Sequence, residues 1–120
     1  MSATDSIEQE IRAKGLMAPR ITPTDIDANI ASEHYFTASQ AVGLPPVEGV
    51  DYIPPREVSP LDLLTFCVLV LRNGFTVTGE SACASPENFD AEIGRKIARQ
   101  NAVQKIWPLM GYELKSRLNA

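Results

Sequence analysis

The sequence has few of the residues on which small catalytic or metal-binding domains depend. Its 120 residues include two cysteines, Cys67 and Cys83, and one histidine, His34. Two cysteines are too few for a disulfide framework or a metal cage, so we expect both to be buried thiols in a reducing compartment. The sequence also has no glycine-rich phosphate loop and no nucleophile elbow. We therefore expect no metal, no cofactor and no enzyme activity.

Long hydrophobic runs are also missing. The most apolar run covers residues 63–71, whereas a membrane-spanning helix needs about 20 apolar residues. The acidic N-terminal segment, MSATDSIEQEIR, lacks the basic start and apolar core of a secretory signal. We therefore predict a cytoplasmic protein with no membrane partner.

Basic residues are outnumbered by acidic ones, and the formal net charge is −4. Residues 1–60 carry nine acids and four bases, and residues 61–120 carry six acids and seven bases. General nucleic-acid binding needs a basic face that releases counterions from phosphates, so this balance argues against it. A small, locally basic pocket for an anionic ligand is compatible with the same balance.

Helical signals dominate the N-terminal part of the chain, residues 1–42. Acids at the start and bases at the end of an apolar pattern predict a helix over residues 5–14. Its apolar face is narrow, so we expect it to be mobile or to pack on a partner chain. Thr22 followed by Pro23 is a typical helix start, and apolar residues spaced by four predict a second helix over residues 23–41.

A proline-rich connector and a hairpin follow. Residues 43–60 hold five of the nine prolines, which excludes regular helix there. Asn73-Gly74 then separates two strand-like runs, and this pair is the strongest short-range hairpin signal. We predict a hairpin over about residues 62–80, with both turn residues at positive φ. The first strand is apolar on both faces, which indicates a central strand or one covered on both sides.

The last third of the chain predicts the longest helix. Ser85-Pro86 is a second helix start signal, and apolar residues then recur at helical spacing. Pro108 removes one backbone donor and clashes one turn back. We therefore expect a kink or break near residues 104–107 and a separate short helix over about residues 109–118.

Together these elements predict a single α+β domain over residues 1–120. Its parts are the N-terminal helices (1–42), the connector (43–60), and the hairpin with the C-terminal helices (61–120). The expected architecture is a small antiparallel sheet built around the hairpin, packed by the N-terminal helices and a long kinked C-terminal helix. A lone hairpin is marginal in water, so the sheet must gain strands from the connector or another subunit, or be covered by helices.

Polar residues gather between the second strand and the long helix. A helix N-terminus can bind an anion, and paired arginines suit phosphate groups. Arg95 and Arg99 are four residues apart and therefore share one helix face. The alternative is ordinary helix capping beside a solvated basic face. The candidate ligand-binding residues are Thr78, Glu80, Ser81, Ser85, Asn88, Arg95 and Arg99.

Acidic and aromatic residues form a second candidate site, for a partner protein. An acidic surface can attract a basic partner, and an exposed tryptophan can anchor an interface. The alternatives are core packing for Trp107 and a packing role for His34, which has no metal-ligand spacing to another residue. The candidate partner-binding residues are Asp25, Asp27, Glu33, His34, Tyr35 and Trp107.

An ordered series of motifs in the second half of the chain points to a family. The series is Asn73-Gly74, Thr78-Gly79-Glu80-Ser81, Asn88-Phe89-Asp90, Ile93-Gly94 and a terminal segment from Trp107 to Leu114. It resembles the small accessory proteins of phages N4 and Sf6 and of related prophages, and the resemblance extends upstream through ITPTDIDANIASEHYFTASQAV. The resemblance implies an origin and a compartment rather than an activity.

Three hypotheses of function follow. The first is a non-enzymatic phage accessory binding protein in the host cytoplasm. It acts as a homo-oligomer and sequesters a small anionic, nucleotide-like host signal as a counter-defence. The second is a protein–protein module that inhibits or redirects a host protein. The third is a small enzyme that uses Cys83 or Ser81 with His34.

Overall fold

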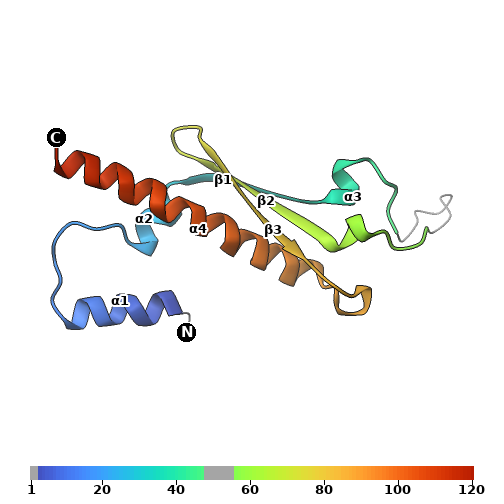
Figure 1. Cartoon of the computed structure of the whole chain (residues 1–120), viewed down its shortest axis with the longest axis horizontal. Coiled ribbons are helices and arrows are strands. Elements are labelled where there is room, and N and C mark those ends of the chain that lie inside the picture. The colour runs from blue at the N-terminus through green and yellow to red at the C-terminus, as the bar shows by residue number, and fades with distance from the viewer. Residues whose placement is uncertain (1–2, 48–55) are drawn as a thin grey trace.

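The computed structural model describes residues 3–47 and 56–120, and it contains a three-stranded antiparallel sheet with a long helix along one face (Figure 1). The strand order is β1-β2-β3, so the α+β prediction is confirmed. The helices are α1 (Ala3–Ala13), α2 (Pro23–Ala28), α3 (Ala38–Ala41) and α4 (Ala91–Leu118), the strands are β1 (Ile30–Thr37), β2 (Leu64–Leu71) and β3 (Thr76–Ala82), and two short 3-10 helices are η1 (Pro60–Leu63) and η2 (Pro86–Asn88).

The hydrophobic core lies between α4 and one face of the sheet. Side chains of β2 alternate between buried and half-buried along the whole strand, because successive residues point to opposite faces. The buried set faces α4 and includes Cys67, whose burial confirms the prediction for that thiol. The buried cluster consists of Ile26, Cys67, Leu69, Leu71, Val77, Ala98, Ala102 and Ile106.

The closest approach of α4 to the sheet occurs at Gly79 in β3. A Cβ atom added at Gly79 would lie 2.9 Å from the Cα of Ala102 and would overlap the backbone of Ala98 and Ala102. The helix therefore sits directly on the strand backbone at this point. Small residues on both sides make this contact possible, since any larger side chain would separate the two elements.

The second predicted helix is correct only for its first turn and a half. Thr22 accepts a hydrogen bond from the Asp25 N–H and caps α2, which then ends at Ala28. Residues 30–37 form strand β1 and pair with β2, so the prediction of helix over residues 23–41 is wrong for this stretch, and only its last four residues are helical again, as α3. Isoleucine, tyrosine, phenylalanine and threonine all favour strands, and pairing with an apolar neighbouring strand outweighed the spacing of four.

The predicted hairpin is confirmed, but its turn differs from the prediction. Of the two turn residues only Gly74 has a positive φ, of 89°, so Asn73 does not adopt the expected conformation. The Gly74 N–H donates to the Leu71 carbonyl, and the Leu71 N–H donates to the Phe75 carbonyl. This is a three-residue loop in which a tight turn precedes a left-handed glycine. The Asn73 side chain instead accepts a hydrogen bond from the Phe75 N–H.

Helix α4 continues through Pro108 without a break. The separate helix expected over residues 109–118 is therefore wrong. Proline removes the hydrogen bond to the carbonyl four residues earlier, at Gln104. Both Gln104 and Pro108 are exposed, so that carbonyl faces solvent and the loss of one bond does not end the helix.

The molecule is elongated. Its radius of gyration is 18.8 Å, whereas a compact domain of its length has about 14 Å. Helix α1 confirms the first predicted helix and stands apart from the sheet, below α4 in Figure 1. An ion pair between Glu8 of α1 and Arg20 fastens it, with 2.7 Å between the charged atoms. The central part of the predicted connector, residues 48–55, lies outside the described residues.

We expect Gly79→Ala to lower the free energy of unfolding by about 3 kcal/mol, because the added methyl group must push α4 away from β3. Urea unfolding followed by circular dichroism measures the change. Gly111→Ala is the matched control: a Cβ there meets no atom within 4 Å. The same substitution at that helical position should stabilise by about 0.5–1 kcal/mol. Equal effects of the two variants would contradict the close contact at Gly79.

Candidate functional site

The structure distributes the predicted ligand-binding residues over different surfaces. Thr78 and Glu80 are exposed on the face of β3 that points away from α4, whereas Ser81 lies on the face toward α4. Ser85 precedes the 3-10 helix η2 and Asn88 is its last residue, beyond the end of the sheet. These residues therefore do not converge on one pocket.

The start of α4 does not offer the predicted anion site. The Asp90 side chain accepts a hydrogen bond from the Ile93 N–H at 2.9 Å, so a carboxylate of the chain itself already occupies the helix N-terminus. Ser85 makes no side-chain capping bond in η2. The negative charge of Asp90 would repel a second anion at this position.

Arg99 is held by carboxylates of the predicted partner surface. Its Nε donates to Glu33 Oε1 at 2.9 Å, and its Nη2 lies 3.7 Å from Asp27 Oδ1. The Tyr35 hydroxyl donates to the same Glu33 oxygen at 2.6 Å. Arg99, predicted to bind a ligand, thus pairs with Glu33, predicted to bind a partner protein, and this pair fastens α4 to β1. The guanidinium of Arg99 is not free for an external anion.

The charges in this cluster stabilise one another. The hydrogen bond from Arg99, followed by that from Tyr35, lowers the pKa of Glu33. Burial, followed by the hydrogen bond to Glu33, raises the pKa of Tyr35. The pKa of Arg99 is raised, chiefly by its hydrogen bond to Glu33. At neutral pH Glu33 is therefore ionised and Tyr35 protonated, which fixes the hydrogen-bond directions of the cluster.

Arg95 has a different environment, although it lies one turn earlier on α4. It forms no ion pair or hydrogen bond with any described residue, and it borders a cavity of about 210 Å³ between β1 and the start of α4. We call this cavity the Arg95 groove. The other residues that line it are Tyr35, Phe36, Thr37, Gln40, Thr65, Phe89 and Ala91.

Local structure explains why the Arg95 groove forms. Thr37 ends β1 and caps α3, where its hydroxyl accepts from the Gln40 N–H and the Gln40 side chain accepts from the Thr37 N–H. The short α3 therefore turns the chain away from the sheet. Gly94 lets α4 approach Thr65 closely, because a Cβ there would lie 3.1 Å from the Thr65 hydroxyl. Phe89 precedes the helix and forms an aromatic wall.

A larger cavity of about 660 Å³ adjoins the groove and shares Thr37, Gln40 and Phe89 with it. Arg56 and Asp62 form one of its walls through two hydrogen bonds of 2.6 and 2.7 Å. The Arg56 Nε also donates to the Pro45 carbonyl at 2.7 Å, so the pair holds both ends of the connector together. Hydrogen bonds, chiefly from Arg56, lower the pKa of Asp62.

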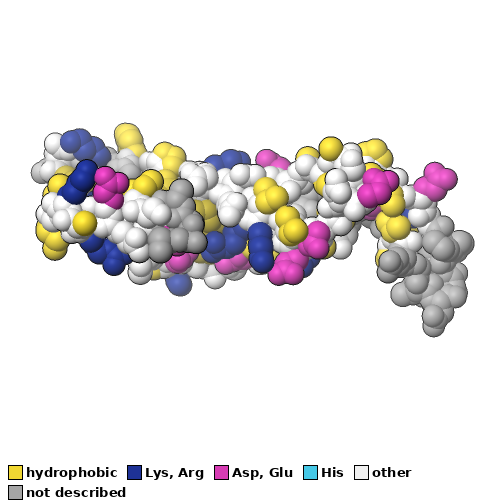
Figure 2. All heavy atoms as spheres, turned by 90° about the horizontal axis from the view of Figure 1, so that it is seen from below, with side chains coloured by type: hydrophobic (Ala, Val, Ile, Leu, Met, Phe, Trp, Pro, Cys, Tyr) yellow, Lys and Arg dark blue, Asp and Glu magenta, His cyan; other side chains and the backbone are white. Residues whose placement is uncertain are grey.

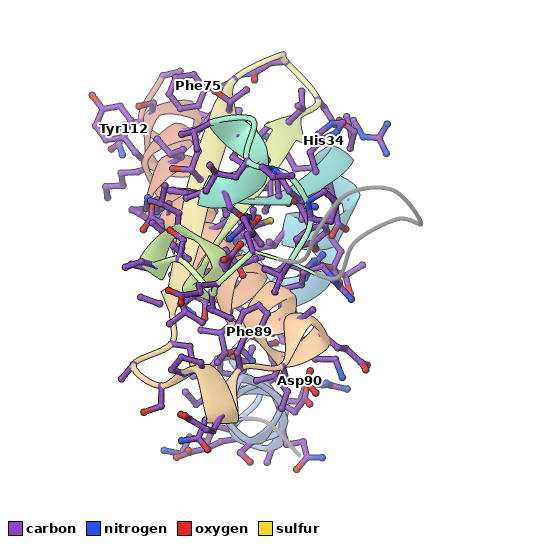
Figure 3. All side chains as sticks on the ribbon, turned by 90° about the vertical axis from the view of Figure 1, so that its right-hand side faces the viewer. His34, Phe75, Phe89, Asp90 and Tyr112 are labelled. Atoms are coloured by element: carbon purple, nitrogen blue, oxygen red, sulfur yellow. The ribbon has the colours of Figure 1, made fainter. Side chains whose placement is uncertain are left out.

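The remaining predicted partner residues serve structural roles or stand alone. Asp25 completes the cap of α2, and Trp107 is half-buried against the core. His34 lies on the face of β1 away from α4, where its Nε2 is 3.0 Å from the Ser32 hydroxyl. Figure 3 shows His34 on the upper side of the molecule and Phe89 and Asp90 below it.

The residues of the enzyme hypothesis do not come together. His34 and Ser81 point to opposite faces of the sheet, and Cys83 follows the end of β3. Cys83 is half-buried rather than buried, and its thiol donates to the Ser85 carbonyl at 3.2 Å. Within residues 3–47 and 56–120, no three histidine, cysteine or acidic side chains lie close enough to hold a metal ion. No helix in the same part of the chain is long and apolar enough to cross a membrane.

The predicted basic face is a mixed-charge surface. Lys96 pairs with Glu92 one turn earlier, at 3.2 Å. In the view of Figure 2, basic and acidic side chains alternate instead of forming one basic field. Sequence reasoning found Arg95 but missed Phe89, Thr37 and Thr65. The motif Asn88-Phe89-Asp90 was a signal for Phe89 alone, and no local pattern marked Thr37 or Thr65, because the groove depends on β1 lying beside α4.

Comparison with known proteins establishes the family. Residues 21–118 match the model of the phage protein (N4 Gp49/phage Sf6 gene 66) family. The chain therefore belongs to this phage protein family, as its ordered motifs predicted. The matched segment contains the sheet, α4 and the Arg95 groove, whereas α1 precedes it. No curated protein and no solved structure matches the chain.

We expect Asp62→Asn to lower the free energy of unfolding by about 2 kcal/mol at neutral pH, because it removes a charged, half-buried partner of Arg56. The pKa of Asp62 is lowered in the folded protein. Its stabilising contribution is therefore complete above the unfolded value of about 3.9 and is lost as the pH falls below it. Urea unfolding of both proteins between pH 7 and pH 2 should show the gap shrinking below about pH 4. A gap that does not change with pH would contradict the assignment, and Asp27→Asn is an exposed control.

Proposed function

We propose that this phage protein is a non-enzymatic binding protein whose ligand is a small anion carrying a flat ring. The single observation that supports this function is the Arg95 groove. It combines Arg95, which pairs with no described residue, with the aromatic wall of Phe89 and with hydroxyl and amide groups. A guanidinium binds phosphate or carboxylate oxygens through two parallel hydrogen bonds, and an aromatic side chain stacks on a planar ring.

The dimensions of the groove favour a ligand smaller than a peptide. Binding sites for small molecules usually have about 300–1,000 Å³. The groove alone, at about 210 Å³, is smaller than this range. Together with the adjoining cavity of about 660 Å³ it falls within the range. A third hollow, of about 380 Å³ between α1, α2 and α4, is bordered by Arg99. It is less suited to an anion, because Asp27 and Glu33 already neutralise that arginine.

A nucleotide meets these requirements, because it joins a planar base to a phosphate. In a phage protein, such binding would remove a nucleotide-derived signal from the cytoplasm of the host and so act as a counter-defence. The protein would hold this ligand without changing it, since its own His34, Ser81 and Cys83 lie apart. Sequestration requires a high protein concentration rather than turnover.

Calorimetric titration with a panel of mono-, di- and cyclic dinucleotides tests the proposal. We expect at least one to bind, and Arg95→Gln to weaken it about tenfold or more, because a charged hydrogen bond contributes about 1.5–3 kcal/mol. Phe89→Leu should weaken binding by loss of stacking on the ring.

Two matched controls accompany this titration. Lys96→Gln removes the same charge from the next residue of α4, and Lys105→Gln removes a positive charge from an exposed position farther along the helix. Both should keep the affinity, with folding checked by thermal unfolding. An unchanged affinity of Arg95→Gln, or binding by no member of the panel, would refute the proposed function.

A further inference from the structure

The sheet has a second face that no described residue covers. We call it the open face, and its central stripe consists of Leu64, Phe66, Val68 and Val70 of β2. These side chains are half-buried by their neighbours within the sheet and are not among the residues packed against the core. A central strand that is apolar on both faces is expected to be covered on both sides. Here α4 covers one side only.

The open face is apolar along its centre and polar along its rims. Phe36 of β1 stacks on Phe66, with 5.5 Å between the ring centroids. Among the strand residues that point to this face, the ionisable ones are His34 on β1 and Glu80 on β3, on opposite outer strands of the sheet. The stripe between them carries no charge, so covering it would desolvate no ion.

A second copy of the same sheet matches this arrangement. Two sheets pack face to face about 10 Å apart with their strands roughly aligned. A two-fold axis parallel to the strands, centred on β2, places the apolar stripe against itself and β1 of one copy over β3 of the other. His34 then faces the strand that carries Thr78 and Glu80, and an imidazole N–H can donate to that carboxylate. An axis perpendicular to the strands would set His34 against itself instead.

We propose that the open face is the interface of a homodimer with the two-fold axis parallel to the strands. The dimer is a four-layer assembly, helix–sheet–sheet–helix, in which each β2 is covered on both faces. Phe36 borders both the open face and the Arg95 groove, but none of the residues changed in the test below lines the groove, so the dimer can be tested independently of ligand binding.

The size of the face sets the expected strength of the dimer. Eleven residues from the three strands point to it, whereas a standard interface has about 20–30 residues on each side. We therefore expect a reversible dimer with a dissociation constant in the micromolar range. Sedimentation velocity from about 1 µM to 1 mM covers the transition from monomer to dimer.

Three variants test the interface. Val68→Glu places a charge at the centre of the stripe and should abolish the dimer. His34→Glu sets two carboxylates together across the interface and should weaken association about tenfold. Adding Glu80→Lys to His34→Glu should restore it, because a lysine then faces the new carboxylate. The two exchanged residues are exposed, so these variants test the interface without disturbing the core. Ile97→Glu is the control, because that side chain is exposed on α4.

Each outcome of these measurements either supports or overturns the proposed dimer. Dimer formation that is lost with Val68→Glu, weakened with His34→Glu, restored by the double change and unaffected by Ile97→Glu supports the proposal. A protein that stays monomeric up to about 1 mM overturns it, since even a weak homodimer forms at that concentration. A dimer that survives Val68→Glu and His34→Glu, or one that Ile97→Glu disrupts, places the interface elsewhere and also overturns it.

Discussion

The contact between Gly79 and the alanines of α4 is the constraint on which the rest of the structure depends. Ala98 and Ala102 place the helix backbone directly on β3, where no side chain larger than hydrogen fits. This fixes the height and position of a 28-residue helix over a small sheet. The core residues, the cluster around Arg99 and the Arg95 groove all follow from that position, because each contains one partner from α4 and one from the sheet or α2.

Two arginines on one face of α4 have opposite roles because of what the sheet places opposite them. Arg99 meets Glu33 of β1 and becomes part of the scaffold. Arg95, one turn nearer the helix start, meets the end of the same strand, where Thr37 and Gln40 carry no charge. A single strand therefore decides which arginine is available to a ligand. The Glu33 carboxylate of β1 also keeps α4 aligned with this strand, so the Arg99–Glu33 pair maintains the shape of the groove.

The two faces of the sheet are free to serve different purposes. The face toward α4 supplies the core and one wall of the groove, and the open face supplies an apolar stripe bordered by His34 and Glu80. Because side chains alternate along each strand, changes on one face leave the other nearly untouched. Self-association and ligand binding can therefore be examined independently of each other in this protein.

The sequence by itself determined the local elements whose signals are contained within a few residues. These are the cap at Thr22, the hairpin around Asn73-Gly74, the long helical pattern after Ser85 and the family to which the chain belongs. Tertiary structure decided strand β1, because its pairing with β2 outweighed a helix-like spacing of apolar residues. It also decided the uninterrupted α4, the pairing of Arg99 and the site beside Arg95. Each of these depends on which residues meet across a distance in the chain, and local pattern carries no information about such contacts.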